Sequence, residues 1–530
     1  MAGIVHVHTT LSDGGGDPQE VMAAARSAGV GFVVITDHGN LAAKPLEGYH
    51  DGLLVLVGTE ISTEQGHLLG LGIPDPQFRF SGDARDALED VRDLGGFSFA
   101  AHPLSPRPDF QWTGWSLPGP WGFELLNGDS QWREAGWVRL ARTAALYKLH
   151  PSYALLGSLT SPRAALARWD ELLAVRDAAG LAGADAHSRV PLPRGRAIRF
   201  PSYESVFRLV QNHVLLPRPL SGEAGPDGRA VLEALAQGRS YVGLDALAPA
   251  GEFSFTAEAD GRVWTMGETA SAEATLRLRA GGRLPRGARI VLLRDGQTHL
   301  EAADRLDAPS PGPGVYRVEV RVPGWDVPWV ISNPIYVFAP AQAEERARRA
   351  AWGPEVPPPD GRLALDSFEK GTIFAPEFDP SSWMNPEVLA SSAGPGGKGA
   401  GRLEFRLGTP APGRPYTWCA LVSRRPLDLS GFRGLVFSIK ADGVYRLWVQ
   451  LRDENPASPD EGTEWWFRSV RTAREWRRVA VPFEAFRSIN KHSDGRLDLD
   501  KIRQLVFVLD AGAVKPETHG TIWLSDVAAY

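Results

Sequence analysis

Cysteine is almost absent from this sequence of 530 residues, in which Cys419 is the single example. One cysteine excludes an internal disulfide framework and any cysteine-rich zinc ribbon. Long apolar runs are also missing: none approaches the ~20 residues that cross a bilayer, so we expect no membrane span. The chain does not begin with a signal peptide. Because so few residues precede the first expected strand, which starts near Ile4, we expect an extracytoplasmic protein whose export signal has been removed.

The chain also lacks an excess of basic residues. Its 57 Lys and Arg against 63 Asp and Glu give a formal net charge of -6. Proteins that bind nucleic acids usually carry a basic stripe, so no nucleic-acid partner is indicated. The hydrophobic content of 43% and charged content of 23% are typical of globular proteins. The length is too great for one core, and about three domains are expected.

Histidine, by contrast, is concentrated in the first half of the chain, where nine of the 12 precede residue 250. In this part, continuous apolar segments such as Phe32–Ile35 and Leu53–Val57 alternate with amphipathic segments, one of which begins at Asp17-Pro18. Apolar strands separated by helices predict a parallel sheet that is covered on both faces. We therefore expect an α/β fold, a β/α barrel, over residues 1–248.

The pattern changes near residue 250 to short alternating strands with Gly and Pro turns. This pattern predicts a small immunoglobulin-like β-sandwich over residues 249–340. A charged, helix-like segment and the Pro-rich WGPEVPPPDG then predict a linker over residues 341–360. Residues 361–530 are again all-β and rich in tryptophan.

Side chains that ligate metals follow strand after strand in the first part. They are His6, His8, Asp13, His38, Glu60, His67, His102, Asp185 and His187. A lone His-x-His pair is a weak motif, and each residue taken alone is more often structural. In a β/α barrel, however, the carboxyl ends of the strands converge on one face, where catalytic residues gather. So many ligands at one topological position predict a metal centre.

Five segments of the first part resemble, in order, the motifs of the PHP (polymerase and histidinol phosphatase) family: HVHTTLSDG, ITDHGN, GTEISTEQGHLLGLG, AAHP and GADAHSR. The forms TEISTEQGH and GADAHS are most similar to its CehA/McbA-type metallohydrolase branch. The resemblance covers roughly residues 4–245. It implies a distorted (β/α)7 barrel that holds two to three divalent metal ions.

The resemblance also implies which side chains hold which ion. The first ion takes His6, His8, Glu60 and Asp185; the second takes the bridging Glu60 with His67 and His102; the third takes Asp13, His38 and His187. Asp37 is expected to orient a ligand imidazole. Sites built from His, Asp and Glu accept zinc, manganese and iron, so the identity of the metal stays open.

The charge of such a centre favours one substrate class. Three divalent ions bring six positive charges, and the carboxylates of Asp13, Glu60 and Asp185 with one bridging hydroxide remove four, which leaves a surplus that suits a phosphate. The metals also lower the pKa of bound water toward ~7. We therefore expect a phosphoesterase that acts on a phosphomono- or phosphodiester through metal-activated hydroxide, with Glu60 and Asp185 at its catalytic centre. The substrate is a small molecule or a glycan-linked phosphate.

Two alternatives to this function remain open. The same ions polarise a neutral carboxylic ester, carbamate or amide, so hydrolysis of one of these is the alternative activity. The second alternative is a glycan-binding protein whose barrel is not catalytic.

Further polar residues near the motifs are candidates for holding a phosphate oxygen: Asn127, Arg133, Arg163, Arg189 and His213. Arg189 ranks first because it follows the ligands of DAHS, and we place Arg189 and His213 with the catalytic group. The alternative for each of these residues is a structural or surface role. Trp112 and Trp115 are candidates for walling a substrate pocket, since aromatic faces stack on sugar rings and bases. The alternative is that they pack the loop that carries them.

Four segments of the last part resemble jelly-roll carbohydrate-binding modules fused to bacterial polysaccharide hydrolases: LALDSFEKGT, LDLSGFRGLVFSIKADG, EWRRVAVPFEAF and GTIWLSDVAAY. The resemblance covers about residues 363–530 and implies a polysaccharide partner. Aromatic residues on strand-like segments either face one concave surface or alternate with core positions; they are Tyr416, Trp418, Tyr445, Trp448, Trp465 and Trp466. In that fold a calcium ion often ties the ends, with Asp366 and Asp526 as candidate ligands.

Overall fold

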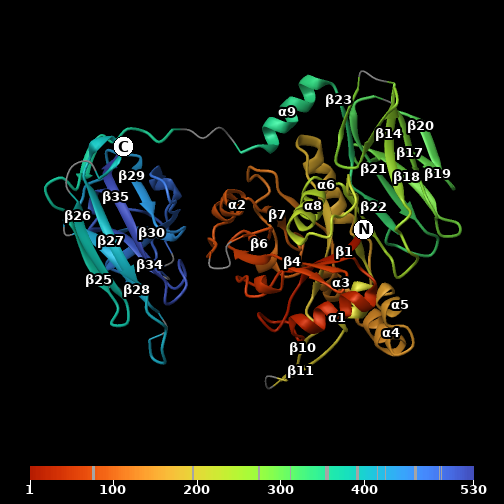
Figure 1. Ribbon diagram of the computed structural model, residues 1–530, viewed down its shortest axis with the longest axis horizontal. Helices are drawn as coiled ribbons and strands as arrows, with labels where there is room; N and C mark the ends of the chain where they lie inside the picture. Colours follow the sequence, from red (N-terminus) through yellow and green to blue (C-terminus); the bar gives the residue numbers. More distant parts are fainter. Residues whose placement is uncertain are drawn as a thin grey trace. The chain divides into compact units, whose positions relative to one another are not determined.

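The computed structural model of the protein describes residues 1–74, 78–193, 196–272, 275–310, 312–352, 357–389, 393–414, 416–423, 425–458, 462–488, 490 and 492–530. The chain divides into two compact units (Figure 1). The first contains Met1–Pro76 and Gly82–Pro354, and the second contains Gln77–Ser81 and Glu355–Tyr530. None of the described helices is long and apolar enough to span a membrane.

The first unit begins with a closed sheet whose central strands are parallel. Their order is β4 (Leu53–Val57), β2 (Phe32–Ile35), β1 (Ala2–Val7), β9 (Gly180–Ala186), β8 (Gly122–Asn127) and β7 (Phe97–Ala100). Antiparallel strands extend it: β3 (Gly48–His50), β5 (Thr59–Thr63), β6 (Gly66–Leu71), β12 (Gln211–Val214) and β13 (Ser240–Gly243). The mixed α/β architecture is thus as expected, whereas the count of seven β/α units stays a prediction.

The helices of this unit connect or cover the strands. They are α1 (Pro18–Ala28), α2 (Ala84–Asp93), α3 (Gly128–Glu134), α4 (Trp137–Tyr147), α5 (Pro151–Leu156), α6 (Arg163–Val175), α7 (Tyr203–Phe207) and α8 (Ala224–Ala236), with the 3-10 turns η1 (Lys44–Leu46) and η2 (Pro108–Phe110). A two-stranded hairpin, β10 (Val190–Pro191) with β11 (Ala197–Ile198), follows β9.

Helix α1 shows how the sequence sets these elements. The Asp17 carboxylate accepts a hydrogen bond from the backbone N–H of Glu20, whose own side chain accepts from the backbone of Asp17. This capping box starts the helix, and Gly29, with a left-handed φ of 76°, ends it. The apolar face of α1 is buried on the sheet, as the spacing of Val21, Met22 and Ala25 predicts.

The β-sandwich continues the sheet of the barrel. Its strands are β14 (Ser254–Ala259), β15 (Arg262–Thr265), β16 (Thr269–Ser271), β17 (Arg277–Gly281), β18 (Arg289–Arg294), β19 (Gln297–Ala302), β20 (Leu306–Pro309), β21 (Gly314–Arg321), β22 (Val330–Ser332) and β23 (Ile335–Phe338). Strand β22 pairs with β13. One core joins Tyr241 and Leu244 to sandwich residues such as Tyr316 and Trp329. The two parts expected on either side of residue 249 therefore form one compact unit, and the boundary itself stays a prediction.

Helix α9 (Pro340–Ala350) occupies the first half of the expected linker. Its Arg346 is buried, pairs with the Asp177 carboxylate at 2.9 Å and donates to the carbonyl oxygen of Leu173 at 2.7 Å. The guanidinium also lies over the ring of Phe338. These contacts fix α9 on the first unit.

The second unit is a sandwich of two six-stranded antiparallel sheets. One contains β24 (Leu363–Asp366), β26 (Trp383–Leu389), β27 (Ala400–Arg406), β29 (Gly434–Ala441), β32 (Arg477–Pro482) and β35 (His519–Ala529). The other contains β25 (Phe374–Phe378), β28 (Trp418–Ser423), β30 (Arg446–Glu454), β31 (Thr463–Arg471), β33 (Arg487–Ser488) and β34 (Gln504–Asp510), and the 3-10 turns are η4 (Pro395–Gly397), η5 (Phe483–Ala485) and η6 (Leu499–Lys501). The inner faces enclose a core that includes Phe437, Phe507 and the free Cys419.

Candidate metal centre

The nine ligands expected from the sequence meet at the carboxyl ends of the parallel strands. They form three overlapping groups whose ligand atoms lie within 4.8 Å of one another: His6, His8, Glu60 and Asp185; His38, Glu60 and His67; and His8, Asp13, His38 and His187. His102 is absent from the groups but contacts Glu60 directly. The structure therefore brings together all nine side chains from five separate segments of the chain.

The first group is fully buried. Oε2 of Glu60 lies 3.1 Å from Nε2 of both His6 and His8, and Oδ1 of Asp185 lies 3.4 Å from the same two nitrogens. Two imidazole nitrogens and two carboxylate oxygens thus face one point. This is the set expected for the first ion.

Glu60 connects the first group to the second. Its Oε1 lies 2.6 Å from Nδ1 of His67 and 2.8 Å from Nε2 of His102, while its Oε2 lies 3.3 Å from Nδ1 of His38. One carboxylate therefore presents each of its oxygens to a different cluster of imidazoles. The geometry suits a carboxylate that bridges two ions, and it adds His38 to the pair His67 and His102 expected there.

The third group is the most open. Oδ1 of Asp13 lies 3.2 Å from Nε2 of His187, 3.7 Å from Nδ1 of His8 and 3.8 Å from Nε2 of His38. The Asp13 side chain is 51% exposed, whereas the carboxylates of Glu60 and Asp185 are buried. This group is therefore the part of the centre most accessible to solvent.

The donor set fits divalent transition metals. Both ring nitrogens of His8, and Nδ1 of His38 and of His102, are buried without a hydrogen-bond partner in the described part of the chain. Such atoms are costly to bury unless a ligand satisfies them. Imidazole nitrogens with carboxylate oxygens suit zinc, manganese and iron alike. The residues are thus a donor set that could hold metal ions, with eight of the nine in the three groups.

The charged side chains of the centre strongly shift one another's pKa values. Burial opposes ionisation of Glu60, yet the surrounding imidazoles, His6 first, lower the pKa of this carboxyl well below its usual range. Asp13 and His187 form the more open pair of the centre. Burial opposes the charged form of each side chain, but His187 lowers the pKa of Asp13 to about 2 and Asp13 raises the pKa of His187 to about 9. The carboxylates are thus ionised and ready to bind cations near neutral pH.

The backbone is strained at three of the ligands. The φ angles of His6, His102 and Asp185 are 70°, 29° and 46°, in the left-handed region. The pairing register of β1 with β2 and with β9 shifts at the same place. Left-handed non-glycine residues cost roughly 1–3 kcal/mol each and persist where surrounding structure enforces them. The strain aims His6 and Asp185 into the centre.

Glu124 is part of the centre although no sequence motif indicated it. Its Oε1 lies 2.6 Å from Nδ1 of His6, the ring nitrogen opposite the one that faces Glu60. Its Oε2 accepts hydrogen bonds from the backbone N–H of His102 at 2.6 Å and from Nδ2 of Asn127 at 2.7 Å. A carboxylate behind a ligand imidazole fixes its tautomer and orientation. The available signal was a lone glutamate inside the apolar strand GFELLN.

Two neighbours hold Glu124 in place. A Cβ at Gly183 would lie 1.7 Å from Oε1 of Glu124, so only glycine leaves room for the carboxylate. Asn127, expected as a phosphate-holding residue, instead donates to Glu124 and caps α3 by accepting from the backbone N–H of Ser130. Both polar ends of Asn127 are thus used within the protein.

Asp37 has a different role from the one expected. Its carboxylate accepts hydrogen bonds from the backbone and hydroxyl of Thr9, at 2.7 and 2.8 Å, and from the hydroxyl of Ser12 at 2.6 Å. It therefore shapes the loop between His8 and Asp13 and does not orient a ligand imidazole.

Arginines lie around the open side of the centre. Arg189 donates to the backbone carbonyl of Asp13 at 3.1 Å. Arg133 and Arg107 both pair with the Asp129 carboxylate, and Arg107 also lies 3.8 Å over the ring of Phe110, which packs edge-on against His67. Arg133 and Arg189 are thus near the centre as expected, and Arg107 joins them.

His213 and Arg163 do not reach the centre. His213 pairs with the Asp245 carboxylate at 2.8 Å, stacks on Tyr241 and sits opposite Ala2, at the start of β1 rather than its end. Arg163 is 80% exposed and pairs with Asp326 of the sandwich at 2.7 Å. The antiparallel direction of β12 places His213 at the far end of the sheet, so the catalytic role expected for it is wrong.

Trp112 and Trp115 pack the loop that carries them. Trp112 is buried, with its ring centroid 5.5 Å from that of Trp121, and Trp115 lies 5.7 Å from Phe123 with Arg168 over its ring. The pocket wall expected of these two residues is therefore replaced by a small aromatic core.

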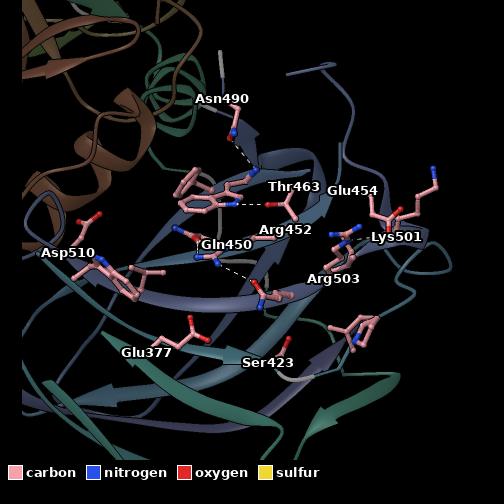
Figure 2. A pocket seen from close by; sticks show the side chains of 18 of the residues that line it. Glu377, Ser423, Gln450, Arg452, Glu454, Thr463, Asn490, Lys501, Arg503 and Asp510 are labelled. Carbon is pink, nitrogen blue, oxygen red and sulfur yellow. Dashed lines mark hydrogen bonds and ion pairs between the residues drawn. The ribbon is translucent and has the colours of Figure 1, made fainter. Parts of the chain in front are cut away.

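The second unit carries a separate groove of about 1840 Å³ on the face of the sheet that contains β30 and β31 (Figure 2). Aromatic side chains along it are Tyr416, Trp418, Trp465 and Phe467. Near its middle, the Arg452 guanidinium lies 4.2 Å over the ring of Trp465 and donates to the side-chain oxygens of Gln450 and Gln504. Flat rings beside amide and guanidinium groups are the surface that sugars bind.

The aromatic residues of the last part divide between two faces, which is the second of the two arrangements that the sequence left open. Tyr416, Trp418 and Trp465 line the groove, and Trp448 packs beside Trp418 with its N–H donated to Asp510. Trp466 is buried in the sandwich core, and Tyr445 packs against that core. The two-residue period of β31 explains why its neighbouring tryptophans face opposite ways.

The candidate calcium ligands lie on paired strands, with Asp366 opposite Val527, but their carboxylates bind different protein groups. The Asp366 carboxylate accepts from the backbone N–H groups of Phe368 and Ile373, both at 2.8 Å. The Asp526 carboxylate pairs with Lys398 and Arg478, both at 2.7 Å. Each carboxylate is satisfied by a different set of protein groups, so the two do not form the expected site.

No protein-family model matches this chain. An uncharacterized protein of Methanocaldococcus jannaschii is 29% identical over 121 residues, which are 20% of this chain and 70% of that protein. A two-domain protein of Bacteroides vulgatus, described as containing a predicted PHP-like metal-dependent phosphoesterase, is 15% identical with a TM-score of 0.29 and covers 63% of this chain and 94% of its own.

Carbohydrate-binding modules of Clostridium thermocellum are similar to part of the chain. A family 11 module in complex with a β-1,3-1,4-mixed-linked tetrasaccharide is 17% identical, with a TM-score of 0.26 and coverage of 32% of this chain and 96% of that one. A family 30 module is 15% identical, with a TM-score of 0.24 and coverage of 31% and 94%. None of these scores assigns a function, so the chemistry of the side chains must decide it.

Proposed function

We propose that this protein is a metal-dependent hydrolase of the PHP type, of the CehA/McbA-like branch, and that it cleaves phosphomono- or phosphodiesters. The observation that carries the proposal is the position of Glu60, whose two oxygens face different imidazole clusters at 2.6–3.3 Å. A buried carboxylate shared in this way supports a di- or trinuclear centre. Divalent ions held there supply Lewis-acid polarisation of the ester and activation of water.

The protein's own groups favour an anionic substrate. The open third group is bordered by Arg189, and Arg107 and Arg133 stand nearby on the shared carboxylate of Asp129. Arg107 and Arg133 carry two positive charges against the single negative charge of Asp129. One positive charge therefore remains for a phosphate oxygen to bind. A neutral ester would gain no charge attraction from these arginines. Hydrolysis of an ester, carbamate or amide is therefore the alternative and not the first proposal.

The test is metal analysis of the purified full chain followed by turnover of a panel of aryl phosphate mono- and diesters against aryl acetates. We expect two to three zinc, manganese or iron ions per chain, and loss of both metal and activity on chelation. Glu60→Gln should lower turnover by more than about 100-fold. Glu64→Gln, exposed on the same β5–β6 hairpin, is the matched control. Active protein without metal, or a preference for acetates, would overturn the proposal.

We further propose that the groove of the second unit binds polysaccharide, so that the substrate is presented on or near a glycan. Trp465 is the residue on which we expect a sugar ring to stack. Its indole N–H donates to the Thr463 hydroxyl, its backbone N–H donates to Oδ1 of Asn490, and the Arg452 guanidinium lies over its ring. Trp465→Ala should weaken retention on insoluble polysaccharide by about tenfold while turnover of a small aryl phosphate is unchanged. Trp383→Ala, an exposed tryptophan on the other sheet, should leave both unchanged.

A further inference from the structure

Helix α4 of the first unit presents apolar side chains to the outside. Trp137 is 80% exposed, Val138 61% and Leu149, just past the helix end, 77%. Thr143 is buried on the side of α4 that faces the protein. At 3.6 residues per turn, Val138, Ala141, Ala145 and Leu149 form one stripe on the outer side. Figure 1 shows α4 and α5 at the edge of this unit.

Basic residues flank the stripe. Residues 135–169 contain five Lys and Arg and no Asp or Glu, in a chain whose formal net charge is -6. Two of the five, Arg163 and Arg168 on α6, pair with Asp326 and Glu171, so Arg142 and Lys148 are the cations that concern the stripe. Arg142 and Lys148 lie on either side of the stripe by helical position, and neither forms a salt bridge in the described part of the chain. An exposed apolar stripe with free cations on both flanks is typical of helices that lie in the headgroup layer of a bilayer.

A second element extends this surface toward the metal centre. The β10–β11 hairpin follows the ligand His187, and residues 186–203 hold four arginines and no acidic residue. Of these, Arg189 donates to the Asp13 carbonyl and Arg199 pairs with Glu20 at 2.6 Å. Its Leu192 and Ile198 are 41% and 50% exposed. The two elements are joined because Phe200 packs on Tyr147, at 4.7 Å between centroids, and Tyr147 accepts from the backbone of Ser202.

We infer that α4 and the β10–β11 hairpin together dock the first unit on an anionic lipid surface. The cations match acidic headgroups, and the stripe matches the apolar layer just beneath them. A second copy of this chain is disfavoured, because a two-fold interface would place these cations against their own copies.

The test is co-sedimentation of the full chain with vesicles of phosphatidylglycerol and phosphatidylcholine in equal parts, and with phosphatidylcholine alone. We expect binding only to the anionic vesicles, weakened by salt. Val138→Glu with Leu149→Glu, and separately Arg142→Glu with Lys148→Glu, should each reduce partitioning by roughly tenfold or more. Val263→Glu, at a position 58% exposed on β15, is the matched control and should bind like the parent.

Turnover of a small aryl phosphate should be the same in all these variants, which separates this inference from the proposed hydrolase activity. Equal binding to neutral vesicles, no binding to either kind, or an equal loss with Val263→Glu would overturn the inference. So would a dimer in size-exclusion chromatography that Val138→Glu dissociates, because the face would then belong to a second copy. Capture of an acidic protein without vesicle binding would also overturn it.

Discussion

Oε1 of Glu124 lies 2.6 Å from Nδ1 of His6, and both side chains are fully buried. The contact leaves Nε2 of His6 to face Glu60 and Asp185, where the first ion is expected. One residue from the middle of β8 thereby sets the orientation of a ligand on β1. The first two predictions follow from this pair.

Glu124→Gln should lower metal affinity by about 10–100-fold. Oε2 of Glu124 accepts from two donors, the backbone N–H of His102 and Nδ2 of Asn127. A glutamine amide must turn its NH2 either toward these donors or toward His6, so one set of contacts is lost. Competition with a chelator followed by metal analysis measures the effect. Glu134→Gln, exposed on α3, is the control, and an unchanged affinity in Glu124→Gln would refute a positioning role.

Gly183→Ala should reproduce the defect without touching a charged group. The added Cβ would stand 1.7 Å from Oε1 of Glu124, so the carboxylate must leave its position behind His6. Gly225→Ala, where a Cβ meets nothing within 4 Å, is the control. Because both changes act through one contact, the double variant with Glu124→Gln should lose less affinity than the two single losses combined. Additive losses would contradict this account.

Asp13→Ala should remove one ion and leave another. Asp13 lies within 3.8 Å of His8, His38 and His187, whereas the first group keeps its buried ligands Glu60 and Asp185. Loss of a divalent ion with one carboxylate lowers the cluster charge by one unit, so phosphate esters should suffer more than neutral esters. Anomalous scattering from crystals counts the ions. Three ions at full occupancy, or equal rate losses on both substrates, would reject the assignment of Asp13 to the third ion.

Asp453 should make the second unit more stable in acid. Burial raises the pKa of this carboxyl to about 6 from its ordinary 3.8, against the hydrogen bonds that it accepts from Asp498 and Trp466. Because the folded state holds the proton more tightly, the free energy of unfolding should fall as pH rises from about 4 to about 6. Asp453→Asn should flatten this slope in urea denaturation, while Asp500→Asn, an exposed neighbour, should keep it. An unchanged slope in Asp453→Asn would contradict the shift.

The sequence by itself singled out the ligands of the centre. His6, Asp13, Glu60 and Asp185 each stand at or just after an apolar strand, and parallel strands must end on the same side of a sheet. Their convergence is therefore a consequence of the parallel sheet, which the alternation of strands and helices predicted. The spacing of apolar residues likewise predicted helix α1, whose capping residues lie next to it in the sequence. It also predicted the all-β character of the two later parts of the chain.

Tertiary structure alone decided what depends on partners distant in sequence. Glu124 acquires its role from His6, 118 residues away, and from the space left by Gly183. His213 was expected to hold a phosphate oxygen, but its strand runs antiparallel to β1 and carries it to the opposite end of the sheet. Trp112 and Asn127 looked exposed to substrate, but Trp112 packs against Trp121 and Asn127 binds Glu124. A sequence pattern indicates which segments form strands and which residues they offer, whereas the direction of each strand in the sheet and the partner of each side chain are fixed only when the segments pack.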